Sequence, residues 1–108
     1  MKILFIESVK FTEQIARLDA EDSLEELEND LIADPERGDL IQGTGGFRKI
    51  RMKMPGRGKS AGARVVYFHE KERCVVYLAF AYTKSRQSDL TEDQKAALRL
   101  QAAYLKSR

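Results

Sequence analysis

Cysteine, histidine and tryptophan are nearly missing from this sequence of 108 residues, which has one cysteine, one histidine and no tryptophan. With Cys74 alone, the chain can form no internal disulfide, and one cysteine with one histidine provides too few ligands for a structural zinc site. With His69 alone, acid–base catalysis by a pair of histidines is excluded. We therefore expect a protein that uses no metal and no cofactor.

Long hydrophobic runs are absent as well. No apolar stretch approaches the roughly 20 residues of a membrane-spanning helix. The opening MKILFIES becomes acidic before the hydrophobic region of a secretion signal can develop. The composition, 43% hydrophobic and 33% charged, is typical of a folded soluble domain. We expect one cytoplasmic domain over residues 1–108, with a single core and no membrane partner.

What the sequence does contain is charge, and this charge is unevenly distributed. Residues 1–39 carry 4 basic and 12 acidic side chains, residues 40–69 carry 7 basic and no acidic ones, and residues 70–108 carry 8 basic and 5 acidic ones. The formal net charge of +2 hides this contrast. A polyanion such as a nucleic acid should be repelled by the first third and attracted to the middle.

The hydrophobic pattern predicts a strand, two helices, three strands and a final helix, in that order. The predicted strands cover residues 3–6, 49–54, 64–69 and 73–81, and the predicted helices cover residues 11–18, 19–34 and a segment after residue 91. Asp19 is expected to cap the second helix, and Thr91 with Gln94 has the spacing of a capping box. Consecutive strands with short links favour an antiparallel meander, so we predict an α+β fold with helices packed against one small antiparallel sheet.

The predicted strand at residues 49–54 alternates strictly between basic and apolar side chains. Because successive side chains of a strand point to opposite faces, Lys49, Arg51 and Lys53 should line one face while the apolar residues enter the core. The glycine-rich segment 55–62 follows, and we expect it to form a loop that carries two more cations. The pattern therefore predicts a hairpin with a strongly cationic face.

The remaining candidates for a functional motif have simpler structural explanations. The glycines of residues 43–46 precede a strand, whereas a phosphate-binding loop joins a strand to a following helix, so a tight turn is the simpler interpretation. Cys74, in a continuously apolar segment, is expected to be a buried packing residue, and His69 a structural one. The acidic residues lie far from the cationic hairpin in the sequence, which disfavours a two-metal nuclease.

Clustered lysines and arginines suit one reaction in particular. When the 2′-hydroxyl of RNA attacks the neighbouring phosphate, negative charge develops on the phosphorane, and guanidinium groups stabilise this charge more than the ground state. Arg51 and Arg64 suit this role, and neighbouring cations make Lys49 a candidate base. The same surface can also bind phosphates without cutting them, and the chemistry of the residues alone favours such binding.

Three ordered segments make the chain similar to a known family. GDLIQGTGGFRKIRM, then GARVVYF, then AYTKSRQSDLT before a closing helix resemble the RelE superfamily of toxin–antitoxin toxins, most closely its HigB branch. The resemblance spans nearly the whole chain. It implies a RelE-like fold, a small antiparallel sheet with two amino-terminal helices and one carboxy-terminal helix, which agrees with the fold predicted from the residues.

The resemblance implies a metal-independent, ribosome-dependent endoribonuclease that cleaves messenger RNA in the ribosomal A site. The catalytic residues that it implies are Lys49, Arg51, Arg64 and Lys84. Where RelE has a further arginine and a tyrosine, this chain has Ser85 and Thr91. We assign contacts with RNA or the ribosome to the other cations of this region, which are Arg48, Lys53, Arg57, Lys59 and Arg86.

The resemblance also implies partners, namely the ribosome, messenger RNA and a cognate antitoxin of the helix-turn-helix HigA type. Two non-enzymatic alternatives stay open from the sequence. One is a toxin of the related ParE kind that poisons DNA gyrase, and the other is a basic module that only binds nucleic acid. Both use a basic surface without aligned catalytic groups.

Overall fold

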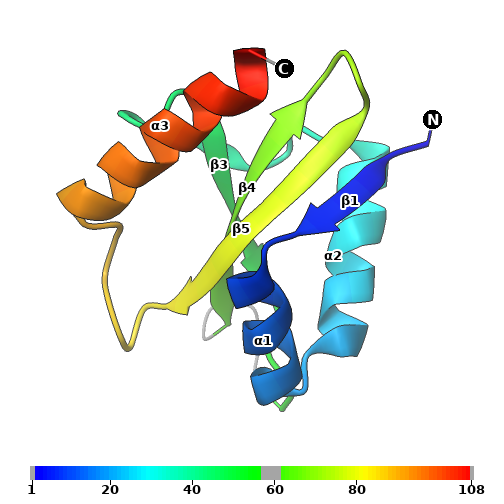
Figure 1. The fold of residues 1–108 in the computed structure, drawn as a ribbon. Coiled ribbons are helices and arrows are strands. Elements are labelled where there is room, and N and C mark those ends of the chain that lie inside the picture. The colour runs from blue at the N-terminus through cyan, green and yellow to red at the C-terminus, as the bar shows by residue number, and fades with distance from the viewer. Residues whose placement is uncertain (1, 57–61, 108) are drawn as a thin grey trace.

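The computed structural model describes residues 2–56 and 62–107 and shows one sheet with helices on both faces (Figure 1). The elements, in chain order, are β1 (Leu4–Glu7), α1 (Val9–Leu18), α2 (Glu21–Ala33), β2 (Asp39–Leu40), β3 (Phe47–Met52), β4 (Ala63–Glu70), β5 (Val75–Thr83) and α3 (Glu92–Ser107). The five strands are arranged in the order β1-β5-β4-β3-β2. Helices α1 and α2 pack on one face, and α3 packs on the other.

The predicted α+β class is confirmed, and β3, β4 and β5 form the predicted antiparallel meander. Two details of the sheet differ from the prediction. β1 pairs with β5 in parallel, so the sheet is mixed, and β2 adds a two-residue edge strand antiparallel to β3. A parallel pair needs a long crossover, and nearly the whole domain lies between β1 and β5 in the chain.

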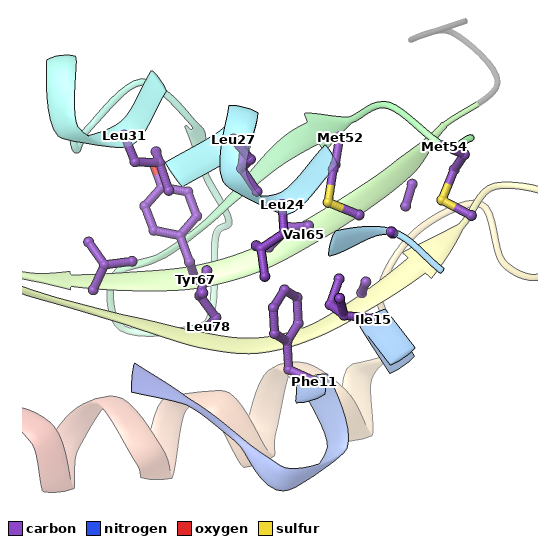
Figure 2. Close-up of a cluster of buried hydrophobic side chains, with 14 residues drawn as sticks. Phe11, Ile15, Leu24, Leu27, Leu31, Met52, Met54, Val65, Tyr67 and Leu78 are labelled. Atoms are coloured by element: carbon purple, nitrogen blue, oxygen red, sulfur yellow. The ribbon is translucent and has the colours of Figure 1, made fainter. Parts of the chain in front are cut away.

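One face of the sheet carries a closed apolar core. Leu24, Leu27 and Leu31, at helical spacing along α2, point toward Val65 and Tyr67 of β4 (Figure 2). The other buried members of this cluster are Phe11, Ile15, Ala20, Met52, Met54, Ala63, Val76, Leu78 and Ala81. This core covers one side of β3 and β4, and the side chains on the opposite side of both strands do not take part in it.

The opposite face is apolar only where α3 covers it. Leu98 and Leu105 of α3 cluster with Phe47 of β3 and Phe68 of β4. These two phenylalanines are cross-strand partners, and their ring centroids lie 5.2 Å apart. The later residues on this face of β3 are the cations of the alternating pattern, so one face of the sheet changes from a core to a charged surface along its length.

The helix boundaries confirm one predicted cap and correct another. The N–H of Gln94 donates to Thr91 Oγ1 (3.1 Å) and the N–H of Thr91 donates to Gln94 Oε1 (2.9 Å), which is the predicted capping box of α3. The prediction that Asp19 caps α2 is wrong. Asp19 instead ends α1 in the left-handed conformation (φ 53°), where its N–H bonds to the carbonyl of Ala16, and α2 begins after it without a side-chain cap.

The glycine-rich residues 43–46 form a tight turn, as the simpler interpretation predicted. Thr44 is fully buried in it, donating from Oγ1 to the carbonyl of Ile41 (2.7 Å) and accepting from the N–H of Phe47 (3.1 Å). A Cβ at Gly45 would lie 3.0 Å from Cβ of Ala102 in α3. The turn is therefore packed against α3 and does not form an open anion-binding loop.

Cys74 corrects another expectation. It precedes β5, with φ of 56° and intermediate burial, and is not a buried residue of the strand. His69 is nearly buried at the end of β4, with Nδ1 3.5 Å from Glu36 Oε2. In the described part of the chain, no helix is long and apolar enough to cross a membrane.

Candidate active site

The part of the sheet that α3 does not cover carries cations of β3 and β4, and these cations line a cavity of about 590 Å³. Its walls come from α2, the turn before β2, β2 itself, β3, β4, the end of β5 and the loop after β5. All four residues predicted to be catalytic line this cavity, namely Lys49, Arg51, Arg64 and Lys84. The other charged residues of the lining are Arg37, Asp30, Asp39 and Asp89. The structure thus gathers five cations and three carboxylates around one hollow.

Arg51 and Arg64 are direct cross-strand partners, an arrangement that is unfavourable for two like charges. Arg64 is only 7% exposed, and its Nη1 is buried without a hydrogen-bond partner among residues 2–56 and 62–107. Leaving a buried donor unpaired costs about 1–3 kcal/mol, and more for a charged group. A bound anion would offset both costs, so this pair of arginines is a candidate anion-binding position.

Lys49 has a counter-ion that sequence reasoning missed. Its Nζ lies 3.6 Å from Oδ1 of Asp89. The N–H of Leu90 donates to the same oxygen (2.8 Å), and this hydrogen bond, together with the charges of Lys49 and Lys95, lowers the pKa of Asp89 although burial opposes the shift. Asp89 is therefore ionised at neutral pH.

Tyr82 is a second residue of the cavity that sequence reasoning missed. It is the cross-strand partner of Arg64 and is 7% exposed. Burial raises the pKa of Tyr82, and the charge of Asp89 raises it further, while Arg64 lowers it. Its hydroxyl is therefore protonated at neutral pH and provides the cavity with a neutral donor.

A β-bulge brings Tyr82 to this face of the sheet. Along the β4–β5 pair, Val66 faces Phe80 whereas Tyr67 faces Leu78, so the register skips residue 79. Because strand side chains alternate, one extra residue moves everything after it to the opposite face. Without the bulge, Tyr82 would point into the core under α1 and α2.

The rim of the cavity next to β2 is held by Gly38 and its neighbours. Tyr67 donates from its hydroxyl to the carbonyl of Pro35 and accepts from the N–H of Gly38, both at 2.9 Å. Arg48 donates from Nη1 to the carbonyl of Gly38 (2.7 Å). A Cβ at Gly38 would lie 2.8 Å from the carbonyl oxygen of Lys49. Only glycine fits here, and this fixes the residues on either side of it at the cavity.

The predicted RNA-contacting residues are placed differently from the catalytic ones. Arg48 lies outside the cavity lining, and its guanidinium bonds to backbone carbonyls of the fold. Lys53 pairs with Glu26 (3.8 Å) on the surface, and Arg86 lines a separate cleft. Arg57 and Lys59 lie outside the described residues. Contacts of these five residues with RNA remain a prediction.

Two carboxylates from the acidic first third do reach the cavity. Asp30, on α2, and Asp39, in β2, are separated from the cationic strands in sequence, yet both line the hollow. Sequence distance was therefore a poor guide to their position. Among the residues that the structure describes, no three histidine, cysteine, aspartate or glutamate side chains gather closely enough to hold a metal ion.

Comparison with protein-family models gives one match that spans almost the entire chain. The model of the "RelE toxin of RelE / RelB toxin-antitoxin system" matches residues 9–108. The chain belongs to the RelE toxin family. The resemblance inferred from the three sequence segments is therefore confirmed for this family.

Two solved RelE structures have the same fold. One is a double arginine-to-alanine variant of E. coli toxin RelE in the free state, with a TM-score of 0.63 and 17% identity over 93% of this chain and 99% of that one. The other is the intact E. coli RelBE toxin–antitoxin complex, with a TM-score of 0.58 and 18% identity over 74% of this chain and 94% of that one. The RelE-like fold predicted from the sequence is thus confirmed.

Ser85 and Thr91, which stand where RelE has an arginine and a tyrosine, have local structural roles. Ser85 lies 3.0 Å from Thr83, hydroxyl to hydroxyl, and Thr91 forms the capping box of α3. Neither residue lines the cavity, whereas Tyr82 and Asp89 do. The cavity therefore contains a tyrosine and a carboxylate at positions that the resemblance did not indicate.

Proposed function

We propose that this chain is the toxin of a toxin–antitoxin system and acts as a metal-independent endoribonuclease on messenger RNA in the ribosomal A site. The observation that carries this proposal is the buried, unpaired Nη1 of Arg64, opposite Arg51 in a cavity that also contains Lys49 and Lys84. A site that only holds phosphates at its surface does not need a buried guanidinium with an unused donor. A site that stabilises negative charge as it develops in a transition state does need such a buried, unused donor.

The proposed reaction is attack of a 2′-hydroxyl on the adjacent phosphate. The 2′-hydroxyl gives its proton to water, and the bond from the 2′-oxygen to phosphorus forms. The bond from phosphorus to the 5′-oxygen breaks as this oxygen takes a proton from Tyr82, which regains one from water, so the products end in a 2′,3′-cyclic phosphate and a 5′-hydroxyl. Arg51 and Arg64 bind the non-bridging oxygens, on which negative charge increases in the transition state. The like-charge repulsion between them is lowest when that charge is greatest.

The other cavity residues have distinct proposed roles. Lys49 exchanges Asp89 for the phosphate, and Asp89 holds the ammonium group over the cavity until then. Lys84 adds positive charge at the mouth of the cavity. Tyr82, whose raised pKa keeps it protonated, donates to the 5′-oxygen as this oxygen leaves. Tyr82, on β5, is thus our proposed general acid.

We further propose that the chain is of the HigB type, with the ribosome as its site of action in the cytoplasm. Its partner is then an antitoxin of the helix-turn-helix HigA kind. E. coli RelE forms a complex with its antitoxin RelB, and a comparable partner here would neutralise or cover the cavity. The uneven surface charge supports a partner with an acidic segment.

Expression in growing bacteria tests the proposal. We expect growth arrest with fragmentation of transcripts, rescue by the small open reading frame next to the gene, and no arrest with an Arg64→Met variant. Growth arrest with intact transcripts and gyrase-dependent DNA breaks would reject the proposal in favour of a ParE-type toxin. Retention on RNA without arrest would favour a binding module.

A further inference from the structure

A second cleft, of about 310 Å³, lies between α1 and the loop that follows β5. Its lining includes three cations, Lys10, Arg17 and Arg86, and no carboxylate. Within the part of the chain that is described, none of the three has an ion-pair partner. Three unneutralised cations around one concave surface favour an anionic ligand.

Two of these three cations come from the acidic first third of the chain. Residues 1–39 hold 12 acidic and only 4 basic side chains, and two of those four are Lys10 and Arg17. Together with Gln14 they follow one side of α1 at intervals of four and three residues, and all three line the cleft. At the cleft, this side of α1 therefore contributes two cations and no carboxylate.

The cleft also offers aromatic surface and shares one lining residue with the first cavity. Phe80 and Tyr82 line it, and Tyr82 lines the cavity as well. Nζ of Lys10 lies 5.5 Å from the centroid of the Phe80 ring. A base that stacks on Phe80 takes the place of this ammonium, which is then free for a phosphate. Cations combined with aromatic faces are the usual means of binding single-stranded nucleic acid.

The walls of the cleft are held in place by side chain to backbone bonds. Gln14 Nε2 donates to the carbonyl of Ala81 and Gln14 Oε1 accepts from the N–H of Ala81, both at 2.8 Å. Gln14 thus pairs with β5 where β1 has ended. On the other wall, Gln87 donates to the carbonyl of Asp89 (2.7 Å) and to Oε1 of Gln94 (3.0 Å). The cations are therefore presented on a fixed frame.

We propose that this cleft binds the single-stranded RNA that runs on from the scissile phosphate. Lys10, Arg17 and Arg86 contact its phosphates, and a base stacks on Phe80. This proposal rests on the proposed function for one point only, which is the identity of the phosphate that is cleaved. Tyr82, which lines both hollows, lies between the RNA segment that reacts in the cavity and the RNA segment that the cleft binds.

The test compares a triple variant, Lys10→Gln, Arg17→Gln and Arg86→Gln, with a control of equal charge change, Lys71→Gln, Arg73→Gln and Lys106→Gln. All six residues are exposed in the structure, so both proteins should fold. The ligand is a short RNA with 2′-O-methyl groups, which cannot be cleaved. Its affinity is measured against salt concentration by fluorescence anisotropy.

Removing three phosphate contacts from a single strand should reduce the slope of log K against log [salt] by about 2 units. The control should change it by less than about 0.5 units. We also expect Phe80→Leu to weaken binding without changing the slope. Equal losses in the cleft variant and the control, or no measurable RNA binding by the unaltered protein, would overturn the proposal.

Two arms separate the source of the RNA. With messenger on the ribosome, the cleft variant should cleave with a higher KM and an unchanged kcat, whereas binding to ribosomes without messenger should match the control. The reverse pattern would overturn the assignment to messenger in favour of ribosomal RNA. RNA binding that depends on the cleft, with no cleavage by the unaltered protein, would reject the proposed function and leave this inference standing.

Discussion

The two faces of the sheet are built from the same strands, yet they differ in what they bury. Under α1 and α2, the side chains of β3 and β4 enter a closed apolar core. On the opposite face, Phe47 of β3 and Phe68 of β4 pack under α3, and the cations Arg51 and Arg64 line a cavity farther along the same strand pair. Strand alternation lets one backbone serve both purposes. Side chains that stabilise the core and side chains of the proposed active site thus alternate along the same strands. We therefore expect substitutions on one face to leave the other face unaffected.

The largest expected effect is on the charged face, at Arg64. Arg64→Met keeps an apolar stem and removes the guanidinium, and we expect cleavage to fall about 10³-fold because the developing charge loses a donor. Stability should not fall, because the change removes a buried unpaired donor and the repulsion with Arg51. Cleavage assays and urea unfolding measure the two effects. Arg73→Met, at an exposed position, is the control and should change neither.

The apolar face should respond in the opposite way. Leu31 is a fully buried residue of α2. Leu31→Ala is expected to lower the free energy of unfolding by about 3 kcal/mol, because it removes contacts and leaves a cavity. Cleavage per folded molecule should stay unchanged. Leu100→Ala removes the same atoms from a 75% exposed position and should cost less than about 0.5 kcal/mol. A loss of cleavage in folded Leu31→Ala protein would mean that the two faces are not independent.

A smaller effect is expected at Tyr82. Tyr82→Phe keeps the ring in both hollows and removes only the hydroxyl, so RNA binding should be retained while the single-turnover rate falls about 100-fold. Because burial raises the pKa of Tyr82 above its ordinary value, the wild-type tyrosine keeps its proton at neutral pH. An unchanged rate in the variant would remove Tyr82 from the proposed mechanism.

The smallest effect is expected at Asp89. Its pKa is lowered in the folded protein, so the stability that it contributes is present above its unfolded pKa, near 4, and is lost as the pH falls through the folded value. Asp89→Asn should therefore be less stable than wild type at pH 7, by at most about 1 kcal/mol because the pair is half exposed. The difference should shrink as the pH falls below the unfolded pKa and through the lowered folded pKa. Urea unfolding at pH 7 and at a series of lower pH values measures it, and a difference independent of pH would contradict the ion-pair explanation.

The part of the site that sequence could predict is the part that depends on local pattern. The period of two at residues 49–54 placed Lys49 and Arg51 on one face, and the antiparallel order of β3 and β4 put Arg64 beside them. The capping box of α3 followed from Thr91 and Gln94 alone. In each case, neighbouring residues in the chain determine the geometry.

The rest depends on contacts between distant segments. The bulge that turns Tyr82 toward Arg64 is visible only in the register of β5 against β4. The pairing of Lys49 with Asp89 joins residues 40 positions apart. The parallel position of β1 likewise needs the whole fold. A periodic pattern contains none of these long-range pairings, so they had to come from the structure.

The most direct test of the central claim is the mapping of messenger RNA ends on translating ribosomes, with wild-type protein and with Arg64→Met. The proposed function predicts cuts within A-site codons that leave 2′,3′-cyclic phosphate and 5′-hydroxyl ends, in the wild-type reaction only and without added metal. Intact messenger with wild-type protein, or equal cutting by Arg64→Met, would contradict it.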